Sequence, residues 1–521
     1  MSTRLRNLTV TLIVIFSGFA VVSAQAQDYD LVILNGRVMD PESGLDAVRN
    51  VGIKDGKIAV VTEKAIKGKE TIDAKGHVVA PGFIDTHHHN VLMPFGRKLA
   101  LRDGITTTLE IEGGVMPVGD WYDSMEGKSQ TNYGATSSVM GAREMTLNPK
   151  FKSVTGASLA DLEQAKVSGA TMKWSTNVAT DAEIEKILSR VEEGLKQGAL
   201  GVGLTTGYMV DGITSRETYG AQKLAGKYSL LLGLHGRFSG QDQGASGMLG
   251  TDEQLAAAAA GGGGLIVQHM TAQCLDLTKY CQEMIDNAYA NGMQVISEVY
   301  PYSYGATIVG ADYLHPDNYE NNMGHTYGDI VEIATMKPLT KERYEELVKT
   351  APFTNVTFKN ATKEDVYRAL AHPTSLIGSD AFPYSRKSDG SFVTDWDTPY
   401  DAVNGHPRGA GTHARVLQLV REENLMPLML AISKMTYMPA KFMVDNGIAQ
   451  MANKGRLQVG ADADITVFDP ATVKQVAIPA NGGLPSEGIP YVVVNGTIVV
   501  KDSKVLKDVY PGRPIRNEVQ N

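Results

Sequence analysis

The strongest constraint on the fold is a long alternation of strands and helices that lies between two β-rich ends. From residue 80 to residue 440, apolar runs such as GALGVGLTT and LIVQHM alternate with helical patterns such as TDAEIEKILSRVEEGLKQG. Such alternation predicts a parallel sheet with helical crossovers. At this length we expect an α/β fold built on a (β/α)8 TIM-type barrel. A doubly wound open sheet is the alternative, but no glycine-rich nucleotide-binding motif opens a helix.

The two ends of the chain predict a second, smaller domain. Short apolar runs surround Asn35-Gly36, Asp55-Gly56 and Asn495-Gly496, and such dipeptides are typical of two-residue β-hairpins. We therefore expect a small β-sandwich domain built from both termini. Its parts are residues 27–79 and 441–521, and the barrel occupies residues 80–440.

The first 26 residues have the pattern of a secretory signal peptide. Arg4 and Arg6 precede an apolar run over residues 8–22, and Ala24 and Ala26 supply the small side chains of a cleavage site. Removal of residues 1–26 predicts a periplasmic or secreted protein with no membrane segment after cleavage. An uncleaved membrane anchor is the alternative, although the run is short for a membrane span.

Composition narrows the classes of partner. The net charge is −9 and no lysine- or arginine-rich run is present, which argues against nucleic acid as a partner. Cys274 and Cys281 on a single helix would lie two turns apart, about 10 Å along its axis, which is too far for a disulfide. We therefore do not expect a disulfide-built fold. Whether the chain forms a homo-oligomer stays open.

Metal-compatible side chains stand where successive predicted strands end. Functional groups of a parallel barrel lie at the carboxyl ends of its strands, so these residues are the candidates for a site. One isolated histidine at a strand end is usually structural, but several in order along the chain indicate a shared metal site. The residues are His87, His88 and His89 after APGFID, Glu110 and Glu112 in GITTTLEIEGG, His235 in LLLGLHGR, His269 in LIVQHM, and Asp380 in TSLIGSD.

The spacing of the first histidines predicts how they act. Alternate residues of a strand point to the same face, so His87 and His89 can reach one ion while His88 points away. Imidazole suits zinc, iron, nickel or copper, and a bound divalent ion lowers the pKa of a water toward about 7. Asp380 would then take the proton of the nucleophile and pass it to the leaving group.

A second ion would need a bridging ligand. We favour Glu112, beside Gly113-Gly114, as a carboxylate shared with His235 and His269, and Glu110 is the alternative. One or two divalent ions are therefore expected, with the number left open.

The motifs together resemble those of the amidohydrolase superfamily. PGFIDTHHH, the two later histidines and the aspartate in GSD resemble its metal-site motifs, and GRLQVGADADITVFDP and GIPYVVVNGTIVV resemble its closing sheet segments. The similarity covers essentially the whole mature chain. Within the superfamily the chain is most similar to N-acyl-D-amino acid deacylases, including D-aminoacylases and N-acyl-D-glutamate deacylases. The resemblance implies a zinc-dependent hydrolase that cleaves the linear amide of a small substrate bearing a free carboxylate, an N-acyl-D-amino acid that can be acidic.

The resemblance also indicates residues on the substrate side. QGALGVGLTTGYMVDG places Tyr208 near the substrate, and NGHPRGAGTHARVL places His406 and Arg408 in the barrel mouth. Arg237, in LHGR, and Arg408 are candidates for a bidentate clamp on a substrate carboxylate, and pairing with a protein carboxylate is the alternative for each. Tyr384 is expected either to form a hydrogen bond to the substrate or to pack against other side chains.

The chain departs from the deacylase pattern at the metal bridge. Many such deacylases carry a bridging cysteine in a GNCG stretch, where this chain has GITTTLEIEGG, so Glu112 has to replace it. A carboxylated Lys173, as in hydantoinases and dihydroorotases, is the other candidate. A cyclic-amide hydrolase or a dipeptidase is the competing activity. A non-catalytic metal- or ligand-binding barrel is the competing class, but binding alone requires no proton shuttle such as Asp380.

Overall fold

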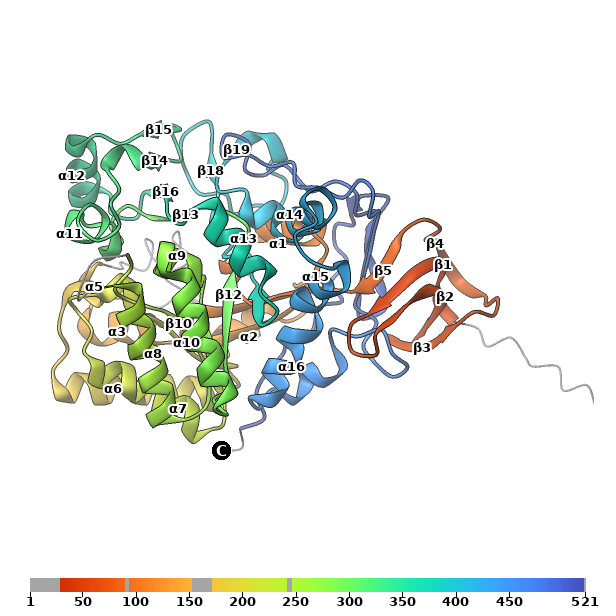
Figure 1. Cartoon of the computed structure of the whole chain (residues 1–521), viewed down its shortest axis with the longest axis horizontal. Helices are drawn as coiled ribbons and strands as arrows, with labels where there is room; N and C mark the ends of the chain where they lie inside the picture. Colours follow the sequence, from red (N-terminus) through yellow and green to blue (C-terminus); the bar gives the residue numbers. More distant parts are fainter. Residues whose placement is uncertain (1–28, 90–92, 152–170, 241–245, 520–521) are drawn as a thin grey trace, which may run out of the picture.

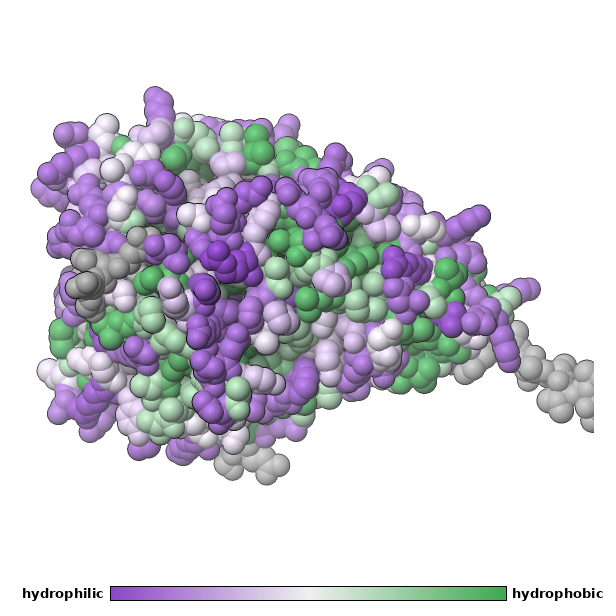
Figure 2. All heavy atoms as spheres, viewed as in Figure 1, coloured by the Kyte–Doolittle hydropathy of each residue, from purple (hydrophilic) through white to green (hydrophobic). Residues whose placement is uncertain are grey.

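The computed structural model describes residues 29–89, 93–151, 171–240 and 246–519 of the chain. The predicted signal peptide, residues 1–26, lies outside these residues. Figure 1 shows a large body of strands and helices at one side and a smaller β-sheet at the other. The face seen in Figure 2 mixes hydrophilic side chains with small apolar patches. None of the helices in the described part has the length and apolar character needed to cross a membrane.

An eight-stranded parallel sheet forms the core of the large body, which confirms the predicted barrel. Each strand pairs in parallel with the next, and nearly every residue in them is buried. Ser379 N donates to Asp85 Oδ1 at 2.9 Å, which joins the last strand to the first. The strands are β6 (Phe83–Asp85), β7 (Ile105–Val115), β8 (Asn132–Ser138), β9 (Gly201–Thr205), β10 (Leu231–His235), β11 (Gly264–Val267), β12 (Val295–Val299) and β17 (Ser375–Ile377).

Amphipathic helices connect and cover these strands. In α6 (Asp181–Lys196), Thr180 and Glu183 form a capping box, in which Glu183 Oε2 accepts from Thr180 N at 2.8 Å. The other helices are α1 (Pro94–Arg102), α2 (Val118–Met125), α3 (Val139–Leu147), α5 (Lys173–Thr176), α7 (Ser215–Lys227), α8 (Gly247–Gly261), α9 (Met270–Cys274), α10 (Thr278–Ala290), α13 (Lys363–Ala371), α14 (Arg408–Glu423), α15 (Leu428–Met435) and α16 (Tyr437–Asp445).

The two ends of the chain build one nine-stranded sheet, as the sequence predicts for a domain made from both termini. Strand β5 pairs with β20, and this pairing joins the N-terminal strands to the C-terminal ones. The sheet has its own apolar cluster, which includes Ile33, Val51 and Ile465. Its strands are β1 (Tyr29–Asp40), β2 (Leu45–Lys54), β3 (Lys57–Thr62), β4 (Gly68–Asp73), β5 (Val78–Pro81), β20 (Ile465–Phe468), β21 (Tyr491–Val494), β22 (Thr497–Lys501) and β23 (Lys504–Val505).

An insertion between β12 and β17 was not predicted from the sequence. It contains a four-stranded sheet and two helices, and side chains from it line the site described below. Its elements are β13 (Tyr304–Ile308), α11 (Pro316–Tyr319), β14 (Ile330–Glu332), β15 (Lys337–Pro338), α12 (Lys341–Thr350) and β16 (Asn355–Lys359).

One of the three predicted hairpins is wrong. Asp55-Gly56 and Asn495-Gly496 do form two-residue turns, between β2 and β3 and between β21 and β22. Asn35-Gly36 instead lies inside β1, where the register with β2 shifts between Ile33 and Gly36. Asn35 has a φ of 62°, so the dipeptide forms a bulge in a continuous strand rather than a turn.

The expectation that the cysteines cannot pair is also wrong, because Cys274 and Cys281 form a disulfide. The expectation assumed a single helix. In the structure α9 ends at Cys274 and α10 begins at Thr278, with Leu275 in between at a φ of 50°. The chain therefore turns a corner, and the two Cα atoms come within 6.6 Å.

Candidate metal centre and active site

The two alternate histidines after β6 point toward one another and toward Asp380. The Nε2 atoms of His87 and His89 lie 3.1 Å apart. Asp380 Oδ1 lies 3.4 Å from His87 Nε2 and 3.3 Å from His89 Nε2. Asp380 follows β17, the strand next to β6 in the closed barrel, so the topology brings residues nearly 300 positions apart to one place.

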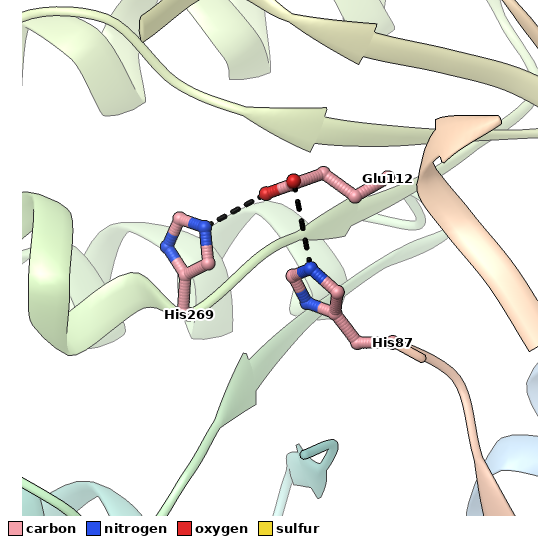
Figure 3. Close-up of side chains that lie close together, drawn as sticks. All are labelled: His87, Glu112 and His269. Atoms are coloured by element: carbon pink, nitrogen blue, oxygen red, sulfur yellow. Dashed lines mark hydrogen bonds and ion pairs between the residues drawn. The ribbon is translucent and has the colours of Figure 1, made fainter. Parts of the chain in front are cut away.

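Glu112, near the end of β7, lies between two pairs of histidines. Its Oε2 is 3.5 Å from His87 Nε2 and 3.4 Å from His89 Nε2. Its Oε1 is 2.9 Å from His235 Nδ1 and 2.8 Å from His269 Nε2. Figure 3 shows this carboxylate between His87 and His269. The structure thus brings together all five predicted metal ligands and the predicted proton shuttle.

The donor atoms of this cluster suit divalent cations. The Nδ1 of His235 lies 3.0 Å from the Nε2 of His269, so each histidine pair has ring nitrogens facing one another. Facing nitrogen lone pairs repel unless a proton or a cation lies between them. The ligand atoms of His87, Glu112 and His269, and those of His87, His89 and Asp380, each lie within 4.8 Å of one another. Imidazole and carboxylate ligands of this kind are typical of zinc sites.

The two carboxylates of the cluster are held in their ionised form. Burial by itself raises the pKa of Asp380, but the charges of Arg408 and His87 outweigh it and lower that pKa. Burial likewise raises the pKa of Glu112, and His87 and His235 lower it further than burial raises it. Ionised carboxylates are the form that can ligate a metal or accept a proton.

Two further carboxylates contact His87 and His89 at their Nδ1 atoms, on the side of each ring opposite the Nε2 atoms that face one another. Glu298 Oε1 lies 2.7 Å from His87 Nδ1, and Glu110 Oε2 lies 2.8 Å from His89 Nδ1. Glu110 Oε1 also accepts from Gly113 N at 2.9 Å, so Glu110 supports a ligand and Glu112 takes the central position. Sequence reasoning missed Glu298, although a lone carboxylate in the apolar run QVISEVYPY was a usable signal.

Arg408 lies at the site, as the sequence predicts. Its Nη1 donates to Asp380 Oδ2 at 2.8 Å, and its Nη2 donates to Ala306 O at 3.0 Å. The guanidinium also stacks over the ring of Tyr300, 5.1 Å from its centroid. Its Nε has no hydrogen-bond partner within the described part of the chain. Arg408 is therefore fixed beside the proton shuttle with a donor unused.

Tyr208 also lies beside the metal ligands. Its ring centroid is 4.8 Å from that of His235, and its hydroxyl oxygen is 3.0 Å from Thr307 Oγ1. Burial raises the pKa of Tyr208 to about 12, so its hydroxyl is a protonated donor near neutral pH. Tyr313, from the insertion, packs against the same histidine with the ring centroids 5.3 Å apart, and it was not predicted.

Of the two roles left open for Arg237, the structure shows the pairing with a protein carboxylate and not the predicted substrate clamp. Arg237 Nε and Nη2 donate to the two oxygens of Glu253 at 2.7 and 2.6 Å. Its Nη1 donates to Ile213 O at 3.0 Å. Arg237 therefore fastens α8 to the loop before α7 and lines neither cavity of the site.

His406 supports the site rather than facing it, which corrects its predicted substrate contact, and Tyr384 packs away from the site. His406 Nε2 lies 2.9 Å from Tyr304 O, and its Nδ1 accepts from Arg408 N at 3.0 Å. Burial lowers the pKa of His406 well below its ordinary value, so the ring is neutral. Tyr384 packs against Phe95 in a separate apolar cluster.

Lys173 and His88 take no part in the cluster. Lys173 is exposed at the start of α5, so it is excluded as a carboxylated bridge between the metals. His88 is fully buried, and burial lowers its pKa to about 3. Neither of its ring nitrogens has a hydrogen-bond partner among the described residues.

Two cavities open on the metal centre, and Glu112 and Tyr208 line both. The first, here named the polar cavity, also has Asp380, Arg408 and Tyr300 in its wall. The second, here named the apolar cavity, has His89 in its wall together with Met140, Trp174, Ile308, Phe353 and Phe382.

Comparison with known proteins agrees with this arrangement. The chain is 27% identical over 519 residues to the N-acyl-D-glutamate deacylase of Alcaligenes xylosoxydans xylosoxydans, covering 94% of this chain and 97% of that protein. It is 33% identical over 237 residues to the dihydroorotase of Streptococcus pneumoniae, covering 43% of this chain and 46% of that protein. The structure of N-acyl-D-glutamate deacylase from Bordetella bronchiseptica with zinc and a phosphonate inhibitor has a similar fold, with a TM-score of 0.73 at 24% identity, covering 94% of this chain and 100% of that one.

The family profile extends over the barrel and over part of the smaller domain. The sequence pattern of the amidohydrolase family matches residues 70–146 and 148–500, which include all five predicted metal ligands and Asp380. This chain therefore belongs to the amidohydrolase family.

Proposed function

We propose that the chain is a metal-dependent hydrolase that cleaves the amide bond of N-acyl-D-amino acids. The observation that carries the proposal is the position of Asp380, whose Oδ1 lies 3.3 to 3.4 Å from two predicted metal ligands while Arg408 holds its Oδ2. An ionised carboxylate at that position can accept a proton from the attacking water and return it to the departing nitrogen.

The similar proteins support the choice of substrate and metal. The curated relative named above is an N-acyl-D-glutamate deacylase, and the structure with the same fold carries zinc. In this chain, His87, His89 and Asp380 would hold one ion, His235 and His269 a second, and Glu112 would contact both. Bound zinc polarises a carbonyl group and makes water a stronger nucleophile at neutral pH.

The side chains of the site transfer the proton and bind the substrate. Water adds its oxygen to the carbonyl carbon, the C–N bond breaks, and the products are a carboxylate and a free amino acid. Asp380 accepts the proton that water loses and donates it to the leaving nitrogen. Arg408, whose guanidinium lines the polar cavity, supplies the positive charge that attracts the substrate carboxylate, and the Tyr208 hydroxyl donates to a substrate oxygen.

A cyclic-amide hydrolase is the second candidate, because part of the chain is similar to a dihydroorotase. The residues of the site favour the linear amide. The carboxylated lysine of such enzymes has no counterpart here, because no lysine lines either cavity beside Glu112 in the described part of the chain, and Lys173 is exposed.

The test is a panel of N-acetyl-D- and N-acetyl-L-amino acids, together with dihydroorotate and a hydantoin, assayed on protein reconstituted with zinc. We expect turnover of the D-amides, and loss of that turnover in Asp380→Asn. Turnover of the cyclic amides alone would favour the second candidate. No turnover of any amide by protein with full metal content would contradict the proposed function.

We also propose export to an oxidising compartment. The signal-like residues 1–26 support export, and the buried pair Cys274 and Cys281 supports an oxidising environment, because disulfides persist outside the reducing cytosol. N-terminal sequencing of protein from the periplasmic fraction tests this, with Gln27 expected as the first residue.

A further inference from the structure

The two cavities at the metal centre differ sharply in chemistry. Asp380, Arg408 and the hydroxyl-bearing Tyr300 and Tyr313 stand in the wall of the polar cavity. The wall of the apolar cavity, apart from the ligands His89 and Glu112, carries no charged side chain among the described residues. A substrate that spans the metal centre therefore meets charge and hydrogen-bonding groups on one side and aromatic and aliphatic groups on the other.

The proton shuttle decides which half of the substrate lies on which side. Asp380 has to reach the departing nitrogen, and it lines the polar cavity but not the apolar one. The carboxylate of an amino acid is two bonds from that nitrogen, and Arg408, the side chain that can pair with it, lines the same cavity. The amino-acid half thus belongs in the polar cavity, and the acyl half extends past Glu112 to the other side.

We infer that the apolar cavity binds the acyl chain, and that the preferred substrates are N-acyl amino acids with apolar acyl chains longer than acetyl. This inference rests on the proposed function. An acetyl group offers a single methyl, which would leave the walls formed by Met140, Ile308 and Phe382 in contact with water. Each further methylene that enters gains about fourfold in binding, because burying one contributes about 0.8 kcal/mol.

A series of substrates with acyl chains of different length tests the inference directly on the wild-type protein. The amino acid that gives the fastest turnover as its N-acetyl derivative would be acylated with butanoyl, hexanoyl and octanoyl chains, and kcat/KM would be measured for each with zinc-loaded protein. We expect kcat/KM to rise about fifteenfold with each pair of methylenes until the cavity is full. A flat or falling series, with the acetyl substrate turned over well, would overturn the inference and leave the proposed function standing. Failure of the whole series, acetyl included, would contradict the proposed function itself.

Variants of Ile308 locate the effect in the cavity. Ile308 lies at the end of β13 and is 4% exposed. Ile308→Phe should move the optimum to a shorter chain, and Ile308→Ala to a longer one. Val348→Phe, on the exposed face of α12 in the same insertion, is the matched control and should keep the wild-type optimum. An unchanged optimum in both Ile308 variants, with folding verified by circular dichroism, would place the acyl chain elsewhere and overturn the inference.

Discussion

Glu298 Oε1 lies 2.7 Å from the Nδ1 of His87, and both side chains are fully buried. Thr86 Oγ1 donates to the other Glu298 oxygen at 2.8 Å, so the carboxylate is itself held in place. A carboxylate on Nδ1 fixes the tautomer of the ring and leaves Nε2 free to ligate. We expect Glu298→Gln to weaken zinc binding by about 10- to 100-fold, measured by competition with a chelator.

Two comparisons make this prediction specific. Glu110→Gln should weaken zinc binding to a similar degree, because Glu110 stands behind His89 in the same way. Glu183→Gln, on the exposed cap of α6, should not change it. Equal zinc affinity in wild type and Glu298→Gln would show that the carboxylate has only a packing role.

Asp380→Asn should lower kcat by at least about 100-fold, because the amide cannot accept and return a proton. The substitution keeps the shape of the side chain, so zinc content measured by mass spectrometry should stay above half of the wild-type value. Asp397→Asn, at an exposed aspartate that pairs with Lys507, is the control and should retain full activity. A variant with full zinc content and more than a tenth of the wild-type kcat would exclude Asp380 as the shuttle.

The two predicted arginines should respond oppositely. Arg408→Met should raise KM about 10- to 100-fold for substrates with a free carboxylate, because their cationic partner is lost. It should also lower kcat, because Asp380 Oδ2 loses the guanidinium that pairs with it. Arg237→Met should leave KM near wild type and lower the free energy of unfolding by about 1–3 kcal/mol, since it removes the bidentate bond to Glu253. Substrate titrations and thermal melts of both variants distinguish these outcomes. A large KM effect in Arg237→Met alone would reverse the assignment.

The barrel and its metal ligands were predictable because both follow from local patterns. Each strand is a short apolar run, and a polar residue at its end is visible as an interruption, as with His269 in LIVQHM. Parallel topology then places all such ends at one rim. No long-range contact had to be known to bring His87 and Glu112 together.

The predictions that the structure contradicts depend on contacts or bends that leave no local pattern in the sequence. The partner of Arg237 stands 16 residues away on α8, and nothing in LHGR distinguishes a substrate clamp from an internal one. The corner at Leu275 that lets Cys274 and Cys281 meet requires a positive φ at a residue type that rarely adopts it. The insertion was missed because its strands are only two to five residues long and most of them are joined by loops.

The disulfide should contribute measurably to stability. It closes a short loop at a sequence separation of 7, for which the chain-entropy model gives about 2.5 kcal/mol. Cys274→Ala with Cys281→Ala should therefore lower the free energy of unfolding by roughly that amount, and Thr251→Val, which removes a hydroxyl near Cys274, should have a smaller effect. Alkylation of the unfolded wild-type protein without reductant should label no cysteine. Two labelled thiols in freshly exported protein would contradict the pairing.

Lys434 should give the protein a pH-dependent stability in the alkaline range. It is fully buried in α15, and its ammonium nitrogen donates to Leu370 O, to His372 O at 2.6 Å and to Ser375 Oγ at 2.8 Å. Burial lowers its pKa to about 7, below the value of about 10.4 in an unfolded chain. Between these values the unfolded state binds more protons than the folded state, so stability rises with pH, by up to about 1.4 kcal/mol per pH unit.

Urea unfolding at several pH values between 7 and 10 therefore should show the wild-type protein gaining stability relative to Lys434→Met as the pH rises. Lys349→Met, at an exposed lysine of α12, should track the wild-type curve throughout. The opposite outcome has a physical basis, because three hydrogen-bond acceptors around the Lys434 ammonium would keep it charged in the folded state despite its burial. Parallel curves for wild type and Lys434→Met would establish that case, and Lys434 would then act as a charged cap that satisfies the last carbonyls of α13.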